Sequence, residues 1–462
     1  MENTWLAIIG SIYVLLLIIA TWGAKRRTHS NADYLFAGSN VGALLGCLTF
    51  SATLFSTFTL MGMPDFFRTH GIGAWIFLGV ADAAVAFIIL WYAKPLRARA
   101  AKRGYQGVSG LLTHCFGTRN AGYLYFLGLF LFLIPYVAVQ IRGIGILLNA
   151  AYPDTLPNWA WSLIIVVSLL IYSEIGGLKA IIYSDAMQGL VLLVVTWIIA
   201  YGCVANFGDI ANMMLKVKQT NATLLSVPGP KGLFTFQFLV ASLLAILALP
   251  ITQPQLATRL VIMKDDGESK KMAVAVGVFS MLVILPTLAI GLFGALSYPD
   301  LSSANFLARV LIHDQAPYIA ALVAVGLTAA AMSTADSQLF ALGAELRSLM
   351  RKPEQALVQT RLAIGAFAGA AFFFAIASSD QLVLLARVSF AGTALLAPMI
   401  LCAVLSESPK PTLIVPATLF ALGCFTASIV DLIPSSYLGV RLDLILFLTL
   451  STLGLITHRF VK

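Results

Sequence analysis

Three oxygen-bearing side chains, Ser333, Asp336 and Ser337, are spaced so that they share one face of a helix. The surrounding segment, about residues 317–347, is long and apolar enough to cross a membrane. A single serine there could simply bond to the carbonyl four residues earlier. An unpaired carboxylate near the bilayer centre, however, costs roughly 2.5 to 3.5 kcal/mol on insertion scales. The sequence therefore predicts a cation near Asp336, and a dehydrated Na⁺ is the compact candidate.

A second polar stretch interrupts the apolar segment at residues 41–62. It carries five hydroxyl side chains within a short distance of one another, Ser51, Thr53, Ser56, Thr57 and Thr59, and is followed by Gly62 and Pro64. So many hydroxyls suit a helix that opens and frees backbone carbonyls, which a membrane tolerates only beside a protein-lined cavity. The alternative is a seam of small residues that packs against another helix.

Gln140 and Arg142 lie inside a third apolar segment, residues 121–149. The planar fork of a guanidinium suits a carboxylate, which could belong to an anionic solute or to a protein acid such as Asp82. Both alternatives remain open at this point. Arg387 lies close to the start of its own apolar segment, and its long side chain could extend to the membrane surface.

Asp185 lies near the start of another apolar segment, residues 182–204. It could be a helix-start acid, which the helix dipole favours by roughly 0.3 to 1 kcal/mol, or it could lie on the path of an ion that leaves toward the cytoplasm. Pro250 and Pro254 remove backbone donors and predict a break near the end of the segment at residues 233–252. Broken helices in both halves of a transporter indicate a shared central site.

The composition is that of a membrane protein. Of the 462 residues 60% are hydrophobic and 11% are charged, and the mean hydropathy is +0.92, far outside the range of soluble domains. The first apolar run, residues 5–23, has no preceding basic residue and no clear cleavage site, so we expect a retained helix. The net charge of +9 is spread over many short connections and indicates topology rather than a nucleic-acid partner.

Hydropathy predicts an all-α membrane protein with about 13 transmembrane helices of about 20 residues each. They lie near residues 5–23, 41–62, 72–93, 121–149, 159–174, 182–204, 233–252, 272–297, 317–345, 361–378, 381–404, 411–430 and 442–457. Lys and Arg are concentrated in alternate connections. This pattern predicts an external amino terminus and a cytoplasmic carboxyl terminus.

Several other functions are disfavoured. All five histidines lie in connections or at segment edges, namely His29, His70, His114, His313 and His458. This placement argues against a buried histidine relay, a histidine-ligated metal and a hydrolase triad in the membrane. The five cysteines lack metal-ligand spacing. Because there is no glycine-rich phosphate loop, we expect no ATP-driven pump, and uphill transport would need an ion gradient. The placement of the histidines also argues against an intramembrane enzyme, so we expect no enzyme.

These motifs together resemble the sodium:solute symporter family, which includes bacterial proline permease, galactose and sialic acid symporters and the sodium-glucose cotransporters. The resemblance covers nearly the whole chain and rests on three stretches, Ala52 to Pro64, Gly176 to Gln188, and Ala330-Ala-Met-Ser-Thr-Ala-Asp-Ser-Gln338. It implies a cell-membrane transporter with a leucine-transporter-like core of five plus five helices in inverted repeats. The repeats would be residues 41–204 and 233–404, with an extra helix at 5–23 and two further helices at 411–457.

The resemblance also implies an ion site. In related symporters Na⁺ lies between the broken first core helix and the eighth core helix, and the matching positions here are Ala52, Phe55, Ala330, Ser333 and Thr334. The acid that matches Asp185 is implicated in sodium release, and in the sialic acid symporter it joins serines of the eighth core helix in a second sodium site. Asp336 and Ser337 share that face here, so a second ion is a candidate. No cofactor other than Na⁺ is expected.

Ser56, Thr59 and Arg142 resemble positions that hold the solute in the sialic acid symporter, and Gln140 lies two residues before Arg142 in the chain. They predict Na⁺-coupled symport, by alternating access, of a small carboxylate such as a monocarboxylate or an amino acid. A sugar, a sugar acid or a vitamin such as pantothenate is the alternative. Proline permease has an acid where this chain has Leu54, which argues against proline. A membrane solute sensor is the alternative from another class, although the chain stops soon after its last predicted helix and we expect no fused kinase.

Overall fold

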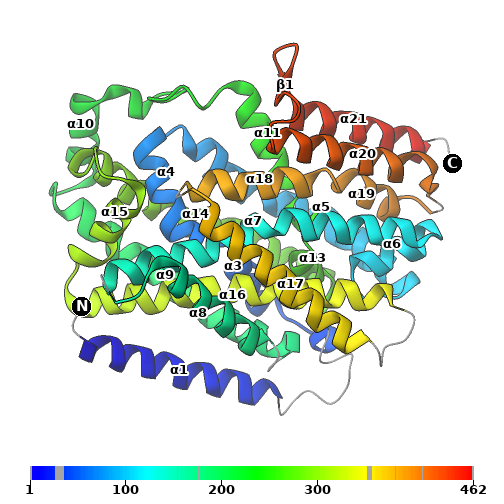
Figure 1. Cartoon of the computed structure of the whole chain (residues 1–462), viewed down its shortest axis with the longest axis horizontal. Helices are drawn as coiled ribbons and strands as arrows, with labels where there is room; N and C mark the ends of the chain where they lie inside the picture. Colours follow the sequence, from blue (N-terminus) through cyan, green and yellow to red (C-terminus); the bar gives the residue numbers. More distant parts are fainter. Residues whose placement is uncertain are drawn as a thin grey trace.

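The computed structural model describes residues 3–25, 36–152, 155–173, 177–350, 356–379, 381–407 and 409–459. Nearly all of them are helical, and the strands in this part of the chain are one short hairpin, β1 (Ser436–Tyr437) and β2 (Val440–Arg441). The long helices run in roughly one direction and form a single bundle (Figure 1). The prediction of an all-α membrane protein is confirmed.

The bundle contains long apolar helices, bent helix pairs and shorter apolar helices, and each coincides with a segment that hydropathy predicts. The long helices are η3 with α5 (Ile76–Val80 and Ala81–Arg103), α7 (Arg119–Ala151), α9 (Gly177–Ala205), α14 (Asp266–Ser297), α16 (Pro317–Leu349), α17 (Ala356–Ala377), α18 with α19 (Leu382–Ala394 and Ala397–Leu405) and α20 (Pro411–Ile429). The shorter ones are α1 (Asn3–Lys25), α8 (Asn158–Ser173) and α21 (Leu442–Arg459). The number of membrane crossings stays a prediction.

The two bent pairs are the broken helices that the sequence predicts. The first consists of α3 (Ala43–Leu54), η2 (Phe58–Gly62) and α4 (Met63–His70), with a bend of 53°. The second consists of α11 (Phe236–Leu247), α12 (Leu249–Thr252) and α13 (Pro254–Val261), with a bend of 55°. Phe55 and Gln253 adopt extended backbone angles at the breaks. Pro254 has no N–H to continue the preceding helix but suits the first turn of the next one. The predicted segment that ends at residue 252 therefore continues as α13.

The first break lies in the middle of the bundle. α3 packs against α9, α14 and α16, while η2 packs against α7 and α18. Two glycines permit this close approach. A Cβ atom at Gly143 of α7 would lie 2.1 Å from Thr57 Cγ2, and one at Gly189 of α9 would lie 3.1 Å from Ala52 Cβ. Glycine at these positions lets neighbouring helices reach the unwound backbone.

The bundle has two ends with different secondary structure. Figure 1 shows the short helices α10 (Ile210–Thr220) and α15 (Ser303–Ala308) at one end, and α6 (Val108–Phe116) with the carboxyl terminus at the other. We call them the α15 end and the α6 end. η5 (Arg309–His313) follows α15 directly.

Arg387 and Arg259 are buried, which differs from the predictions. Arg387 of α18 does not extend to the membrane surface, because it donates hydrogen bonds to Asp443 Oδ2 at 2.8 Å and to Ser242 Oγ at 2.9 Å. Arg259, which hydropathy assigns to a connection, lies in α13 with only 1% of its surface exposed. In both cases a buried polar partner compensates for the loss of water around the guanidinium.

Candidate functional site

The end of α3 meets the middle of α16 through oxygen atoms. Because α3 ends at the break, its last carbonyls have no N–H partner within the helix. Ser333 Oγ donates to the carbonyls of Ala52 and Ala330, both at 3.0 Å. Thr334 Oγ1 lies 3.4 Å from the carbonyls of Ala52 and Thr53. All five residues are buried. Carbonyl and hydroxyl oxygens from two distant segments thus converge, and oxygen ligands are what a hard cation prefers.

Phe55 is the residue at which α3 stops. Its N–H still donates to Ser51 O at 2.7 Å, whereas its own φ and ψ of −97° and 116° are no longer helical. Its ring stacks on Phe279 with 6.0 Å between the centroids. The freed carbonyl of Leu54 accepts from Tyr136 Oη at 3.0 Å. The structure therefore places Phe55 at the break, while its role as an ion ligand stays a prediction.

Side chains also satisfy the N–H groups that the break frees. Ser56 N–H donates to Thr59 Oγ1, Thr57 N–H to Gln140 Oε1 and Phe58 N–H to Ser56 Oγ, each at 3.2 Å. Buried backbone donors need such partners, so these side chains hold the unwound conformation in place. Three predicted solute residues are thus brought together at the break. Thr57 Oγ1 is buried with no hydrogen-bond partner among the described residues.

A charged cluster lies about one helical turn further along α16. Arg259 Nη2 donates to Asp185 Oδ2 at 2.6 Å and to Ser337 Oγ at 2.9 Å, and Arg259 Nε donates to Thr49 Oγ1 at 2.9 Å. Thr49 Oγ1 in turn donates to Asp185 Oδ2 at 2.7 Å. These side chains come from α13, α9, α16 and α3, and at most 2% of each is exposed. The cluster thus joins α3 and α13, one segment of each broken helix, to the helices α9 and α16.

Asp336 lies beside this cluster but does not take part in its hydrogen bonds. It is fully buried, and neither carboxylate oxygen has a hydrogen-bond partner among the described residues. The same holds for Gln188 Oε1 of α9, whose Nε2 donates to Tyr13 Oη of α1 at 2.8 Å. Asp185 and Arg259 lie near enough to act on Asp336 electrostatically. Asp336 is therefore a buried acid that lies outside the Arg259–Asp185 ion pair.

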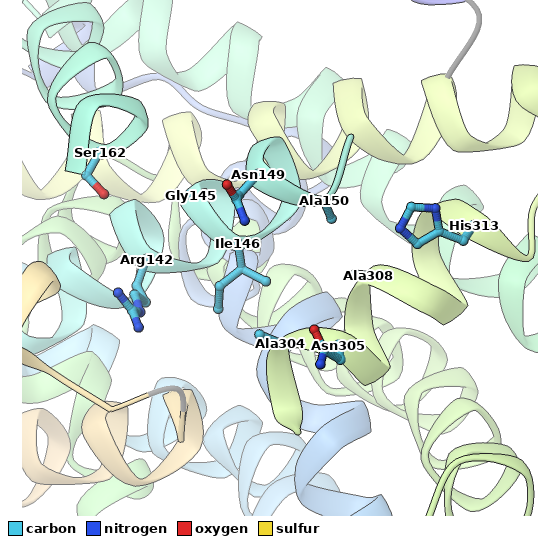
Figure 2. A pocket seen from close by; sticks show the side chains of 10 residues that line it. All are labelled: Arg142, Gly145, Ile146, Asn149, Ala150, Ser162, Ala304, Asn305, Ala308 and His313. Atoms are coloured by element: carbon cyan, nitrogen blue, oxygen red, sulfur yellow. The ribbon is translucent and has the colours of Figure 1, made fainter. Parts of the chain in front are cut away.

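Arg142 lies apart from the break. Two residues along a helix correspond to a rotation of about 200°, so Gln140 and Arg142 point to nearly opposite sides of α7. Arg142 lines a cavity of 270 Å³ at the α15 end together with residues of α8, α15 and η5 (Figure 2). Asp82, the alternative partner, lies on α5, where its carbonyl is 3.4 Å from Ser280 Oγ of α14. The structure does not bring Arg142 together with Ser56 and Thr59.

Some residues at these sites were not predicted as site residues. They are Thr49, Thr57, Tyr13, Tyr136, Gln188 and Arg259. Helical spacing could have found some of them, since Gln188 follows Asp185 by three positions and Thr49 precedes Thr53 by four. Arg259 becomes recognisable only once α13 is seen to begin at Pro254, which places it inside a helix rather than in a connection.

A family model for the sodium:solute symporter family matches residues 34–407. The chain belongs to this family. Among curated proteins it is similar to the sodium/pantothenate symporter of Escherichia coli (strain K12), with 26% identity over 350 residues that cover 73% of this chain and 71% of the relative. It is also similar to the high-affinity proline transporter PutP of Bacillus subtilis (strain 168), with 22% identity over 403 residues, 81% of this chain and 82% of the relative.

The fold matches solved transporters. A Na⁺-coupled sialic acid symporter in a substrate-bound outward-open state superposes with a TM-score of 0.78 at 16% identity, covering 99% of this chain and 98% of the other. MhsT in complex with L-phenylalanine gives 0.57 at 15% identity, covering 91% and 98%. The symporter therefore has the predicted leucine-transporter-like core of five plus five helices. It is an integral membrane transporter that couples a small organic solute to Na⁺, and not an enzyme.

Proposed function

We propose that this symporter carries a small carboxylate-bearing solute, such as a monocarboxylate or an amino acid, together with Na⁺ by alternating access. The observation that supports this most is the unwound stretch between α3 and η2, which leaves backbone oxygens and polar side chains deep in the bundle. Such unwinding lies beside substrate and ion sites in transporters with inverted repeats. Residues 41–204 and 233–404 form the two repeats, with 5–23 and 411–457 outside them.

Na⁺ binds first, between the carbonyls of Ala52, Phe55 and Ala330 and the hydroxyls of Ser333 and Thr334. The contacts between α3 and α16 support this assignment, because they place four of the five residues around one point. Bound Na⁺ would hold α3 against α16 and so fix the inner half of the broken helix. Each Na⁺ that moves inward with the membrane potential supplies roughly 2.3 kcal/mol per 100 mV.

The solute then binds at the break, where Ser56, Thr59 and Gln140 lie. These side chains accept hydrogen bonds from the freed N–H groups. A solute carboxylate would displace them and accept from the same backbone donors. Thr57 Oγ1 supplies a further donor there.

A second monovalent cation binds near Asp336, on the face that also carries Asp185 and Ser337. The count of charges supports this step, because a buried carboxylate without a partner is costly and Arg259 already pairs with Asp185. Since Asp185 Oδ2 and Ser337 Oγ are occupied by Arg259, Asp336 would provide most of the ligand charge. Release of this cation would proceed past Asp185 toward the α6 end.

The amino terminus lies outside and the carboxyl terminus in the cytoplasm. Basic side chains at the end of α5 and the start of α14 support this orientation, and the Arg97–Asp266 ion pair of 2.8 Å places these two segments at the same end. Positive charge is typical of the cytoplasmic side. The α6 end would then face the cytoplasm and the α15 end the outside.

Pantothenate is the second candidate solute. Two similar curated proteins, from Escherichia coli and Haemophilus influenzae, are sodium/pantothenate symporters. Pantothenate also carries a carboxylate, so the same site chemistry applies.

Uptake into liposomes with reconstituted protein tests the proposal. A panel of L-lactate, L-alanine, pantothenate and glucose would be offered with an inward Na⁺ gradient, with K⁺ as the control. We expect Na⁺-driven accumulation of at least one carboxylate and none of glucose. Accumulation of glucose alone would reject the carboxylate assignment, and uptake that is equal in Na⁺ and K⁺ would reject coupling.

A further inference from the structure

Asp82 of α5 is a buried acid that the proposed transport cycle does not use. Only 4% of its surface is exposed. Two other buried acids, Asp185 and Asp443, form ion pairs with arginines. The carboxylate of Asp82 has no hydrogen bond or ion pair within the part of the chain that the structure describes. Since a buried carboxylate without a partner is costly, a positively charged group from outside the chain would stabilise this position.

Local helix structure directs Asp82 to the interior of the bundle. It lies in the first turn of α5, directly after the π-helical turn η3, and wide turns of this kind often occur at functional sites. Asp82, Val85 and Ile89 follow one helical stripe, and at most 4% of each is exposed. This side of α5 therefore faces other helices rather than lipid.

Contacts place Asp82 close to the unwound stretch between α3 and η2. Its carbonyl lies 3.4 Å from Ser280 Oγ of α14, and the residue before Ser280 carries the ring that stacks on Phe55 at the break. Asp82 also acts electrostatically on the hydroxyl of Tyr136, which donates to the freed carbonyl of Leu54 at 3.0 Å. The acid thus lies at the level of the break and near one of its freed carbonyls.

Aromatic rings line the same part of the bundle. Tyr136 of α7 lies edge-on to Phe390 of α18 with 5.0 Å between the centroids, and Phe58 of η2 lies edge-on to the same ring at 6.2 Å. Aromatic rings suit an apolar side chain and also an organic ammonium group. A hard inorganic cation prefers a shell of oxygen ligands, which these rings do not provide. The surroundings of Asp82 therefore favour an organic cation.

We infer that Asp82 binds the ammonium group of the solute, and that the solute is an amino acid with an apolar side chain. The inference rests on the proposed function for the solute carboxylate, which would bind the freed N–H groups of Ser56 and Phe58. The carbonyl of Leu54 lies beside these groups in the chain, so one small molecule reaches both sides of the break. The ammonium donates to Asp82 and to Leu54 O, while the rings surround the apolar side chain. A monocarboxylate without an amino group leaves Asp82 uncompensated.

Solute pairs that differ only in the amino group test the inference. Each amino acid is compared with the hydroxy acid of the same carbon skeleton, namely L-alanine with L-lactate and L-phenylalanine with L-phenyllactate. In liposomes with an inward Na⁺ gradient we expect KM of the hydroxy acid to be about 100-fold higher, because a hydroxyl does not compensate the charge of Asp82. Equal KM within both pairs, or uptake of the hydroxy acids alone, would overturn the inference and leave the proposed function intact.

A variant of Asp82 separates recognition from packing. Asp82→Asn should raise KM of the amino acid about 100-fold and leave KM of the hydroxy acid nearly unchanged, since asparagine keeps the shape and removes the charge. A purely structural role would change both values alike. Ser280→Ala removes the hydroxyl beside the Asp82 carbonyl without changing any charge, so it is the matched control and should keep the wild-type ratio. A wild-type ratio in Asp82→Asn, with or without a shift in the Na⁺ dependence, contradicts the inference.

Binding without transport distinguishes this inference from the proposed function. Thermal unfolding of the purified protein in Na⁺ buffer should show that L-phenylalanine or L-alanine stabilises the wild type but not Asp82→Asn. Stabilisation that depends on Asp82 without any Na⁺-driven uptake would overturn the proposed function alone. Stabilisation of the wild type by the hydroxy acids and not by the amino acids would overturn the inference.

Discussion

Two polar regions lie about one turn apart on α16, and one consists of neutral groups whereas the other consists of charged side chains. The first, where Ser333 and Thr334 meet Ala52, contains only neutral carbonyl and hydroxyl oxygens. The second, where Arg259 meets Asp185, contains full charges that are shielded from water. Neutral dipoles hold an ion without a fixed counter-charge, so release of the ion leaves no buried charge behind. The neutral oxygens therefore suit an ion that binds reversibly, whereas the charged cluster holds four helices together.

The largest expected effect comes from breaking the charged cluster. Arg259→Gln should lower the free energy of unfolding by about 3 to 5 kcal/mol, because it leaves Asp185 buried without its partner. Thermal unfolding of the purified protein in detergent measures this change. Asp185→Asn combined with Arg259→Gln should recover part of the loss. If Arg259→Gln and Asp185→Asn, each made alone, unfolded at the wild-type temperature, the cluster would have no role in holding the helices.

A smaller effect is expected at the neutral oxygens. Ser333→Ala should weaken Na⁺ binding by about 1.5 to 3 kcal/mol, or roughly 10- to 150-fold, since it removes one oxygen from a charged ligand. Na⁺ titration of uptake at saturating solute measures this shift. Ser280→Ala, a buried serine that bonds back within α14 at 2.8 Å, is the matched control and should leave the Na⁺ dependence unchanged. A similar loss in both variants would point to general damage.

Asp336 extends this comparison. It is a buried acid like Asp185, but it has no hydrogen-bond partner among the described residues, whereas Asp185 pairs with Arg259. Asp336→Asn should raise the free energy of unfolding by about 1 to 3 kcal/mol in Na⁺-free buffer, since a buried unpaired acid is costly. It should also change the Na⁺ dependence of uptake from cooperative to hyperbolic, because one cation no longer binds. A hyperbolic curve in the wild type would reject the second cation.

The smallest effect concerns Thr57 at the break. Thr57→Val removes a buried hydroxyl without a partner among the described residues, so thermal stability should stay equal or rise by about 1 kcal/mol. Solute affinity should fall, because this hydroxyl lies beside the unwound backbone and can donate a hydrogen bond to the solute. Thr57→Ser keeps the hydroxyl and should retain affinity. Normal affinity in the valine variant would exclude this hydroxyl from the solute site.

Much of the fold could be predicted from the sequence. Among the described residues, hydropathy located the long apolar helices and both bent pairs, because a bilayer imposes both length and composition. Hydroxyls near Phe55 and prolines near Gln253 indicated both breaks, since each has a direct effect on backbone hydrogen bonding.

The sites were harder to predict, because their partners are distant in the sequence. Hydropathy could not show that α13 buries Arg259, since its charge resembles that of a cytoplasmic connection. The spacing of Gln140 and Arg142 on one helix already implied opposite sides, and the prediction of one joint solute site did not use that geometry. The resemblance to the family indicated the neutral oxygens at Ala52 and at Ser333 through two separate motifs, and the structure brings these two segments together.

Thermal unfolding with increasing Na⁺ and no solute tests the central claim most directly. Ligands that bind the folded state raise its stability, so Na⁺ but not K⁺ should raise the unfolding temperature of the wild type. In Ser333→Ala with Thr334→Ala the account predicts that this Na⁺-specific rise disappears, while Na⁺-free stability changes little. An unchanged Na⁺-specific rise in that double variant would contradict ion binding between α3 and α16.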